Sequence, residues 1–226
     1  MNVILFGASG MVGSGVLLAC LRDPQVDSVV AIGRSPTGHT HPKLREIRHT
    51  DFFDYSGLET EFAAANACYF CLGVSSLGLD QPTYTRLTYD LTLAAARAMV
   101  AANPAMTFCY VSGAGTDSTE QGPRMWARVK GRTENHLLGL GFRAAYMFRP
   151  GYIHPVDGVR SKTAWIRALY LVLGPIVPGV MRLRGRGIVT TTSIGQAMLA
   201  VTRHGYPTQI LEPADILKAA AIDADN

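Results

Sequence analysis

The sequence predicts an α/β fold of the doubly wound type, in which helices cover both faces of a parallel β-sheet. Three observations predict it. Short apolar segments alternate with segments of helical periodicity along most of the chain. Apolar residues make up 48% of the 226 residues and charged residues only 17%, which is enough to build a sizeable core. A glycine-rich turn joins the first apolar segment to the first helix.

Six apolar segments have the length and composition of buried strands. They are Asn2 to Phe6, Ser28 to Gly33, Leu44 to His49, Ala67 to Leu72, Thr107 to Ser112 and Ala144 to Phe148. A helix is predicted from Gly13 to Arg22, where Asp23 and Pro24 end it, and a longer one from about Tyr84 to Ala102, where apolar residues recur at helical spacing. Parallel strands joined by right-handed helical crossovers explain this order.

The regular alternation weakens after Arg149-Pro150-Gly151. The rest of the chain predicts a helix from Thr163 to Leu173, an arginine-rich loop, a helix from Ser193 to His204, a short strand at about Gln209 to Leu211 and a final helix. This tail is too short for a core of its own. We therefore expect a single domain over residues 1–226, with a core of residues 1–155 and a small carboxyl-terminal lobe of residues 156–226.

The turn after the first strand has the spacing of a phosphate-binding loop. It reads Gly7-Ala-Ser-Gly-Met-Val-Gly13, with a glycine at every third position, and the helix follows at once. Glycines permit a tight turn and a close approach of phosphate oxygens, and the start of the helix offers unpaired N–H groups. The pattern predicts a Rossmann-type dinucleotide site that includes Gly7, Ser9, Gly10, Met11, Val12 and Gly13.

The residue that follows the second strand indicates which dinucleotide binds. An acidic residue there would accept a hydrogen bond from the ribose 2′-hydroxyl of NAD, whereas an arginine would pair with the 2′-phosphate of NADP. The sequence has Gly33-Arg34-Ser35 at this point, and Asp27 lies at the wrong end of the strand. Arg34 therefore favours NADP(H) over NAD(H).

Two of the four cysteines, Cys68 and Cys71, form a C-x-x-C pattern that raises the question of a metal or redox site. In a buried strand, side chains three residues apart point to opposite faces and cannot share one metal ion. We therefore expect buried free thiols and no metal. His39 and His41 lie in a loop without acidic partners, which favours solvated side chains.

The net charge of +4 raises the question of an anionic partner. Part of the surplus lies in residues 182–186, but without interleaved aromatic residues or a nucleic-acid-binding motif we expect no nucleic-acid partner. The uncharged stretch from Ala168 to Val180 is shorter than the about 20 residues of a membrane span, so we expect it to cover a pocket or to meet the second subunit of a homodimer. The first apolar run is too short for a secretory signal peptide, which favours a cytoplasmic protein.

Several motifs occur together in one order. They are Gly7 to Gly13, Gly33-Arg34, Thr50-Asp-Phe52, Cys71-Leu-Gly73, Ser112, Val129-Lys-Gly131 and Phe148-Arg-Pro-Gly151. In this order they resemble the atypical short-chain dehydrogenase/reductases, and above all the Tat-interacting-protein-like group, also described as nucleoside-diphosphate-sugar epimerase-like proteins. The likeness covers about residues 1–155 and extends only loosely to the tail.

The resemblance implies further contacts with the dinucleotide. Residues after the third strand would flank the adenine, residues after the fourth would lie along the ribose and pyrophosphate, and residues after the sixth would border the nicotinamide. In the same order these are Asp51 and Phe52; Leu72, Gly73 and Val74; and Pro150, Gly151 and Ile153. The Asp51 carboxylate would accept a hydrogen bond from the adenine amine.

The catalytic position departs from the family pattern. The superfamily uses serine, tyrosine and lysine, the last two in a Y-x-x-x-K pattern, whereas this chain has Trp126-Ala-Arg-Val-Lys130. Lys130 keeps its register and would contact the nicotinamide ribose, and Ser112 would face a substrate carbonyl. Trp126 would line the substrate pocket, because an indole N–H is too weak an acid to protonate the alkoxide that carbonyl reduction leaves.

Three interpretations of the missing tyrosine remain open. Lys130 itself acts as the acid or base, helped by cofactor charge and partial burial. Another side chain substitutes, with Tyr84, Tyr89, Tyr152 and His154 as candidates. In the third interpretation the protein binds NADP without turning anything over.

The sequence thus supports an NADP(H)-binding, oxidoreductase-like protein that reduces a small carbonyl or enone substrate, with Lys130 and Ser112 at the site. The alternative is a non-catalytic NADP-binding regulatory or interaction protein, because Trp126 replaces the tyrosine. The identity of the substrate depends on the tail, where the resemblance is loosest.

Overall fold

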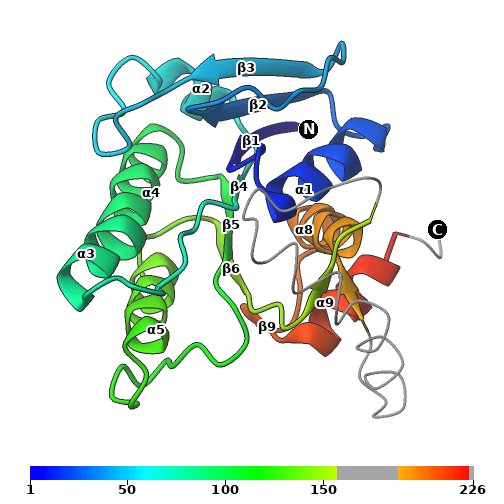
Figure 1. Cartoon of the computed structure of the whole chain (residues 1–226). Coiled ribbons are helices and arrows are strands. Elements are labelled where there is room, and N and C mark those ends of the chain that lie inside the picture. The colour runs from blue at the N-terminus through cyan, green and yellow to red at the C-terminus, as the bar shows by residue number, and fades with distance from the viewer. Residues whose placement is uncertain (157–187, 224–226) are drawn as a thin grey trace.

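The computed structural model describes residues 1–156 and 188–223, and in these ranges a parallel β-sheet lies between two layers of helices (Figure 1). Its strands are β1 (Asn2–Phe6), β2 (Ser28–Gly33), β3 (Leu44–Arg48), β4 (Ala67–Phe70), β5 (Thr107–Val111), β6 (Ala144–Phe148) and β9 (Ile210–Leu211). Their order is β3-β2-β1-β4-β5-β6-β9, and all neighbours are parallel. The order reverses between β1 and β4, and doubly wound sheets bind ligands at such a switch point. The predicted fold class is confirmed.

The helices divide between the two faces of the sheet (Figure 1). One layer consists of α1 (Met11–Arg22), α8 (Thr191–His204) and α9 (Pro213–Ala221), and the other includes α2 (Glu59–Ala64), α4 (Leu91–Ala102) and α5 (Met125–Leu138). A short helix, α3 (Gln81–Thr85), and a π-helical turn, η1 (Arg86–Asp90), run directly into α4. The long helix predicted from Tyr84 therefore begins three residues earlier, where the Asp80 carboxylate accepts a hydrogen bond from the Thr83 amide at 3.0 Å.

The strands are apolar on both sides because both faces of the sheet are buried. On β1, Val3 packs into the layer of α1, α8 and α9, whereas Ile4 packs into the layer of α2 and α4. By the same alternation Cys68 and Cys71 lie on opposite sides of the sheet, as predicted, and all four cysteines are free. Burial raises the pKa of the Cys71 thiol to about 12. Among the described residues, no group of three His, Cys, Asp or Glu side chains is placed to hold a metal ion.

Three of the predicted strands end earlier than the sequence pattern suggests. β3, β4 and β5 end at Arg48, Phe70 and Val111. The amides of His49, Cys71 and Ser112 then each donate one more hydrogen bond, to Gly33, Phe6 and Phe148, at 2.8–3.1 Å. Beyond this bond the chain leaves the sheet, and the turns that follow form the rim of the candidate site.

Two further helices begin before their predicted first residues. α1 begins at Met11, not Gly13. α8 begins at Thr191, not Ser193, because Thr190 is the capping residue: its hydroxyl accepts a hydrogen bond from the Ser193 amide at 3.0 Å. The serine that suggests a helix start is therefore already in the first turn.

The described part of the tail packs on the sheet itself. β9 adds a strand beside β6, and the Tyr69 hydroxyl on β4 lies 3.2 Å from the Met198 carbonyl oxygen and 3.1 Å from the Thr202 hydroxyl, both on α8. The sequence pattern does not predict α2, nor the small parallel sheet of β7 (Ile153–His154) and β8 (Val189–Thr190). This small sheet joins the chain after β6 to the start of α8.

Three predictions lie outside the described residues. They are the helix from Thr163 to Leu173, the apolar stretch from Ala168 to Val180 and the arginine-rich loop at 182–186. Within the described ranges, none of the helices combines the length and hydropathy needed to span a lipid bilayer.

Candidate functional site

The glycine loop closes tightly over the ends of β1 and β4. Gly7 has a φ of +78°, and a Cβ on it would lie 2.7 Å from the carbonyl carbon of Cys71. A Cβ on Gly13 would lie 2.1 Å from the Gly7 carbonyl oxygen, which is closer than any side chain permits. Glycine is therefore required at both ends of the loop, at the first by backbone conformation and at the second by the packing of α1.

α1 begins without a side-chain cap. Gly10 precedes its first residue, no side chain accepts a hydrogen bond at this end, and the first turn, with Met11 and Val12, carries no acidic residue. The first N–H groups of a helix have no partner within the helix, and the positive end of the helix dipole lies there. This helix start therefore fits the negatively charged pyrophosphate of a dinucleotide.

A cavity of about 630 Å³ opens beside the loop, at the carboxyl ends of β1, β2 and β3. Small-molecule sites typically span about 300–1,000 Å³. The lining residues are Gly7, Ala8, Ser9, Ala31, Ile32, Gly33, Arg34, Ser35, Pro36, Thr37, Glu46, Ile47, Arg48, Phe52 and Leu72. Its lining contains both apolar and charged side chains, and its size suits an adenosine moiety.

The structure gathers one part of the predicted dinucleotide site at this cavity and leaves another part outside. Gly7, Ser9, Arg34, Phe52 and Leu72, which come from four separate turns, all line it.

Other predicted residues do not line the cavity. The exposed Asp51 uses one carboxylate oxygen to accept a hydrogen bond from the Phe53 amide at 2.9 Å. Gly73 and Val74 lie exposed beyond Leu72. The sequence pattern does not predict that two charged residues, Glu46 and Arg48, also line the cavity. Both lie near the end of the strand beside β2, and this position is the signal that could have indicated them.

Ser112 and Lys130 are in contact, but through the backbone of the serine. The ammonium group of Lys130 donates a hydrogen bond to the Ser112 carbonyl oxygen at 2.5 Å. The Ser112 hydroxyl is buried and lies 2.5 Å from Glu134 Oε1 and 3.1 Å from the Phe148 carbonyl oxygen. A hydroxyl has one proton, and both of these acceptors lie inside the protein, so in this arrangement Ser112 has no proton to offer a substrate.

Lys130 has an unusual electrostatic environment. Burial lowers its pKa from 10.5 to about 8, and the negative charge of Glu134, one turn further along α5, limits the fall. At this pKa the side chain exists in both protonation states within the physiological range. This is the property expected of a proton donor or acceptor.

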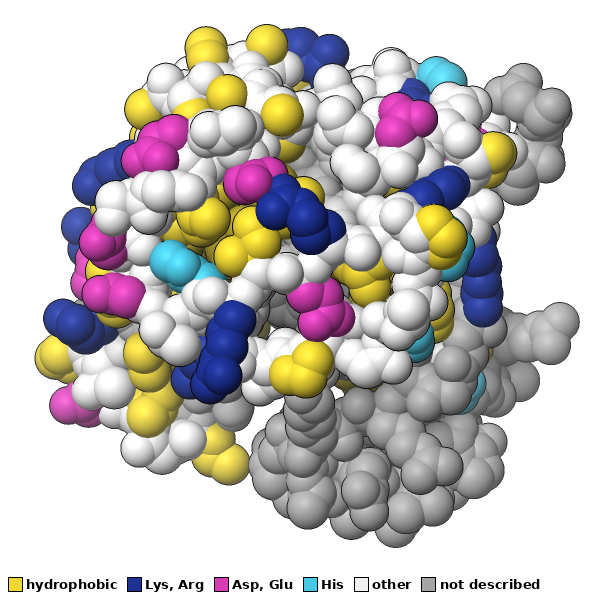
Figure 2. All heavy atoms as spheres, turned by 90° about the horizontal axis from the view of Figure 1, so that it is seen from above, with side chains coloured by type: hydrophobic (Ala, Val, Ile, Leu, Met, Phe, Trp, Pro, Cys, Tyr) yellow, Lys and Arg dark blue, Asp and Glu magenta, His cyan; other side chains and the backbone are white. Residues whose placement is uncertain are grey.

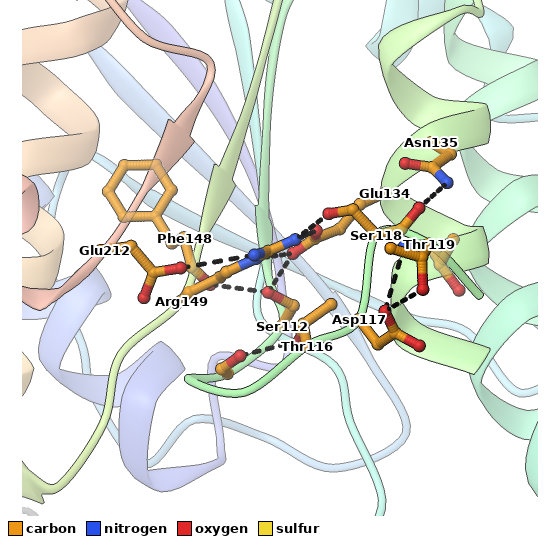
Figure 3. Close-up of polar contacts among 12 residues, drawn as sticks. Ser112, Thr116, Asp117, Ser118, Thr119, Glu134, Asn135, Phe148, Arg149 and Glu212 are labelled. Carbon is orange, nitrogen blue, oxygen red and sulfur yellow. Dashed lines mark hydrogen bonds and ion pairs between the residues drawn. The ribbon is translucent and has the colours of Figure 1, made fainter. Parts of the chain in front are cut away.

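Glu134 and Arg149 form a buried ion pair behind Ser112 (Figure 3). Glu134 is fully buried on α5, and Arg149 follows directly on β6. The Arg149 Nε lies 3.1 Å from both carboxylate oxygens, and its Nη2 also contacts Oε2. Arg149 further contacts the Ser118 hydroxyl at 2.5 Å and the Glu212 carboxylate at 3.3 Å. The group connects β5, α5, β6 and the start of α9.

The sequence pattern does not predict this ion pair, although two features of the sequence point to it. Glu134 lies four residues after Lys130 and so shares its helix face. Arg149 comes directly after β6, a strand in which every residue is apolar or aromatic. A charge in such a place is paired in a folded protein.

Trp126 lies in the first turn of α5, half-buried, and packs with a cluster that contains Tyr84 and Tyr89. Tyr84 is buried, which raises the pKa of its hydroxyl. The Tyr89 ring contacts the guanidinium of Arg132 at 4.3 Å and the ring of His136 at 5.2 Å. Both tyrosines are therefore occupied in packing, which does not favour them as proton donors.

The segment after β6 holds the residues expected at the nicotinamide. Pro150 is buried, and its carbonyl oxygen accepts a hydrogen bond from the Ala114 amide at 2.9 Å, which ties this turn to the one after β5. Gly151 is exposed, and Ile153 lies in β7. Tyr152 and His154 are half-buried in the same segment, and burial raises the pKa of Tyr152.

The positive charges do not gather into one face in the view of Figure 2, which looks onto the molecule from the side of β3 and α2. Lys and Arg side chains lie there in small separate groups, with Asp and Glu between them. A continuous basic surface is therefore not present on this side of the described chain.

No model of a known protein family matches the chain. Among curated proteins, it is similar to the mitochondrial protein fmp52-2 of Aspergillus oryzae, with 24% identity over 222 residues, 95% of this chain and 94% of the relative. The corresponding protein of Neosartorya fischeri is 28% identical over 203 residues, 88% of this chain and 81% of the relative. Both relatives are named as mitochondrial, and this finding overturns the prediction of a cytoplasmic location. The length of the first apolar run does not distinguish the cytosol from an organelle.

Solved structures show the same fold. The UDP-glucuronic acid 4-epimerase of Bacillus cereus in complex with NAD has a TM-score of 0.65 and 14% identity, over 93% of this chain and 76% of that one. A short-chain dehydrogenase of Burkholderia cenocepacia in complex with NADP has a TM-score of 0.62 and 15% identity, over 99% and 94%. The chain thus has the Rossmann-type fold of short-chain dehydrogenase/reductases and NAD-dependent epimerases, which confirms the resemblance at the level of the fold.

Proposed function

We propose that the protein binds a nicotinamide dinucleotide, NADP(H) in preference to NAD(H), and reduces a small carbonyl or enone compound. The observation that carries the proposal is the glycine loop. Its two ends admit no side chain, and its helix start is uncapped, at the point where the strand order of the sheet reverses. Arg34 at the cavity supports the preference for a 2′-phosphate.

The chain offers residues for each part of the dinucleotide. The loop from Gly7 to Gly13 would hold the pyrophosphate. Phe52 and Leu72 would contact the adenosine, and Arg34 would pair with the 2′-phosphate. Asp51, Gly73, Val74, Pro150, Gly151 and Ile153 are the remaining candidates for contacts with the adenine, the ribose and the nicotinamide. When bound, NADPH would supply two electrons and one of the two hydrogens that the reduction needs.

In this proposal Lys130 supplies the second hydrogen as a proton. Its ammonium group is held by the Ser112 carbonyl, and its lowered pKa makes it acidic enough to protonate a developing alkoxide near neutral pH. The proton passes from Nζ to the substrate oxygen, and the neutral amine regains a proton from solvent. Ser112 acts through its carbonyl, because its hydroxyl proton faces Glu134 or Phe148.

A second candidate function is binding of NADP(H) without turnover, as a regulatory or interaction protein. Two observations favour it. Trp126 occupies the position of the family's catalytic tyrosine, and the Ser112 hydroxyl is turned into the protein. The tyrosine and the serine hydroxyl that would polarise a substrate carbonyl in the family are therefore not offered to a substrate here.

Titration and turnover together test the proposal. We expect calorimetry to show tighter binding of NADPH than of NADH, and Arg34→Ala to weaken NADPH alone. A panel of small carbonyls and enones with NADPH should then show turnover that Lys130→Ala abolishes, while NADPH still binds with an affinity lowered by the lost ribose contact. Equal affinity for the two dinucleotides, or none for either, would reject the binding part. Activity that appears only in Trp126→Tyr would support the non-catalytic candidate.

A further inference from the structure

The cavity beside the glycine loop holds two arginines, of which the sequence pattern explains only one. Arg34 follows β2, and Arg48 is the last residue of β3. The register of these strands pairs Gly33 with Arg48, so the two arginines leave the sheet at neighbouring points of the same edge. Both line the cavity.

Neither arginine is neutralised by the described part of the chain. The ion pairs and hydrogen bonds of the described residues involve neither guanidinium. Other arginines are engaged: Arg45, three residues before Arg48, pairs with Glu61, and Arg203 pairs with Asp23. Two arginines that line one cavity and have no acidic partner among the described residues indicate a site for an anion.

One carboxylate faces the same cavity, but it is held by other groups. Glu46 lies two residues before Arg48 and so on the same face of β3. Its Oε1 accepts a hydrogen bond from the Thr37 amide at 3.0 Å and another from the Thr37 hydroxyl. These contacts fix the carboxylate on the turn that follows Arg34, where it adds a negative charge to the cavity without pairing with either arginine.

We propose that Arg34 and Arg48 together form the subsite for the 2′-phosphate of NADP(H), and that the negative charge of Glu46 limits the affinity of this subsite for the phosphate. The inference rests on the proposed function and names the residues that set its cofactor preference. A phosphate monoester carries close to two negative charges and three acceptor oxygens, which guanidinium groups on two sides can engage at once. A 2′-hydroxyl carries no charge, so Arg48 acts on NADPH and not on NADH.

Calorimetric titration of three variants tests the subsite, with NADPH, NADH and the fragments adenosine 2′,5′-bisphosphate and adenosine 5′-monophosphate as probes. Arg48→Ala is expected to lower the affinity for NADPH and for the bisphosphate about tenfold. The affinity for NADH and for the monophosphate should stay within about twofold of wild type. Glu46→Gln keeps the acceptor for Thr37 but removes the charge, so NADPH should bind about twofold to fivefold more tightly. Arg45→Ala, on the same strand but outside the cavity, is the control that should change none of the four.

The outcomes separate this inference from the proposed function. If wild type binds neither dinucleotide, the proposed function itself fails. If wild type prefers NADPH but Arg48→Ala leaves that preference unchanged, or weakens NADPH and NADH equally, the proposed function stands and the two-arginine subsite is overturned. Opposite effects of Arg48→Ala and Glu46→Gln on NADPH alone would support the subsite, because general damage to the fold cannot strengthen binding.

Discussion

The position of Lys130 is set by the local sequence of α5, whereas its pKa is set by burial in the folded protein. On α5 it stands four residues after Trp126, the spacing of the Y-x-x-x-K pattern in the proteins that the chain resembles. Its environment depends on neighbours far away in sequence: the Ser112 carbonyl accepts a hydrogen bond from the ammonium group, and burial by the surrounding protein lowers its pKa. A lysine on a solvated helix face would stay fully charged near neutral pH and would be a poor proton donor.

If Lys130 is the proton donor of the proposed reduction, its pKa predicts how the rate depends on pH. The proposed step needs the ammonium form, so the rate should be constant below about pH 8 and fall as pH rises through that value. Single-turnover oxidation of NADPH, followed by its absorbance across this range, measures the profile. In Lys130→Arg the guanidinium stays charged throughout, so the rate should be low and the decline absent.

The carboxylate of Glu134 gives this prediction a second check. Its negative charge holds the pKa of Lys130 up, so Glu134→Gln should move the decline to lower pH. The glutamine keeps an acceptor for the Ser112 hydroxyl. A wild-type rate independent of pH in this range would show that Lys130 is not the proton donor.

At the scale of elements, the glycine loop and α1 act as one unit. The sequence pattern predicts the loop, the strand before it and the helix after it, because glycine spacing and apolar periodicity are local properties. What the pattern does not show is which glycine is needed for which reason. Gly7 needs a positive φ, whereas Gly13 needs the absence of a side chain against the Gly7 carbonyl.

Replacing two glycines of the loop should have different effects. Gly13→Ala places a Cβ 2.1 Å from the Gly7 carbonyl oxygen, so α1 must shift, and we expect a loss of about 1–3 kcal/mol of unfolding free energy. Gly10 has a φ of −88°, and a Cβ there would lie 3.2 Å from the same oxygen, so Gly10→Ala should fold with a smaller loss. Urea denaturation measures both. A loss in Gly10→Ala as large as that in Gly13→Ala would contradict this account of the loop.

At the scale of the whole molecule, Arg149 connects parts of the chain that sequence separates. It follows directly on β6, pairs with Glu134 on α5, and contacts Glu212 at the start of α9. Burial of an ion pair is costly, and it is sustained here by several hydrogen bonds to the same guanidinium (Figure 3). The group therefore connects α5, the helix that carries Lys130, to the start of α9.

The two acidic partners of Arg149 should contribute unequally to stability. Glu134→Gln leaves the buried guanidinium with only the half-exposed Glu212 as a negative partner, and we expect a loss of about 3–5 kcal/mol of unfolding free energy. Glu212 is 48% exposed, so Glu212→Gln should cost about 1 kcal/mol or less. Urea denaturation of both variants makes the comparison, and similar small losses would show that the buried pair is not a major source of stability.

The sequence by itself determined the fold class, the six strands predicted along residues 1–148, and the glycine loop with Arg34. Each of these depends on patterns within a few residues: apolar runs bounded by turns, helical periodicity, and glycine spacing. The family resemblance added the register of Lys130 on α5.

Only the tertiary structure decided what these residues touch. The parallel sheet brings Arg48 beside Arg34, Glu134 beside Arg149 and the Ser112 carbonyl beside Lys130, although 14 to 18 residues separate the members of each pair. The direction of the Ser112 hydroxyl depends on the Glu134 carboxylate, which is buried and therefore needs hydrogen-bond partners inside the protein. Strand register and burial are properties of the assembled sheet, so no local pattern in the sequence reveals them.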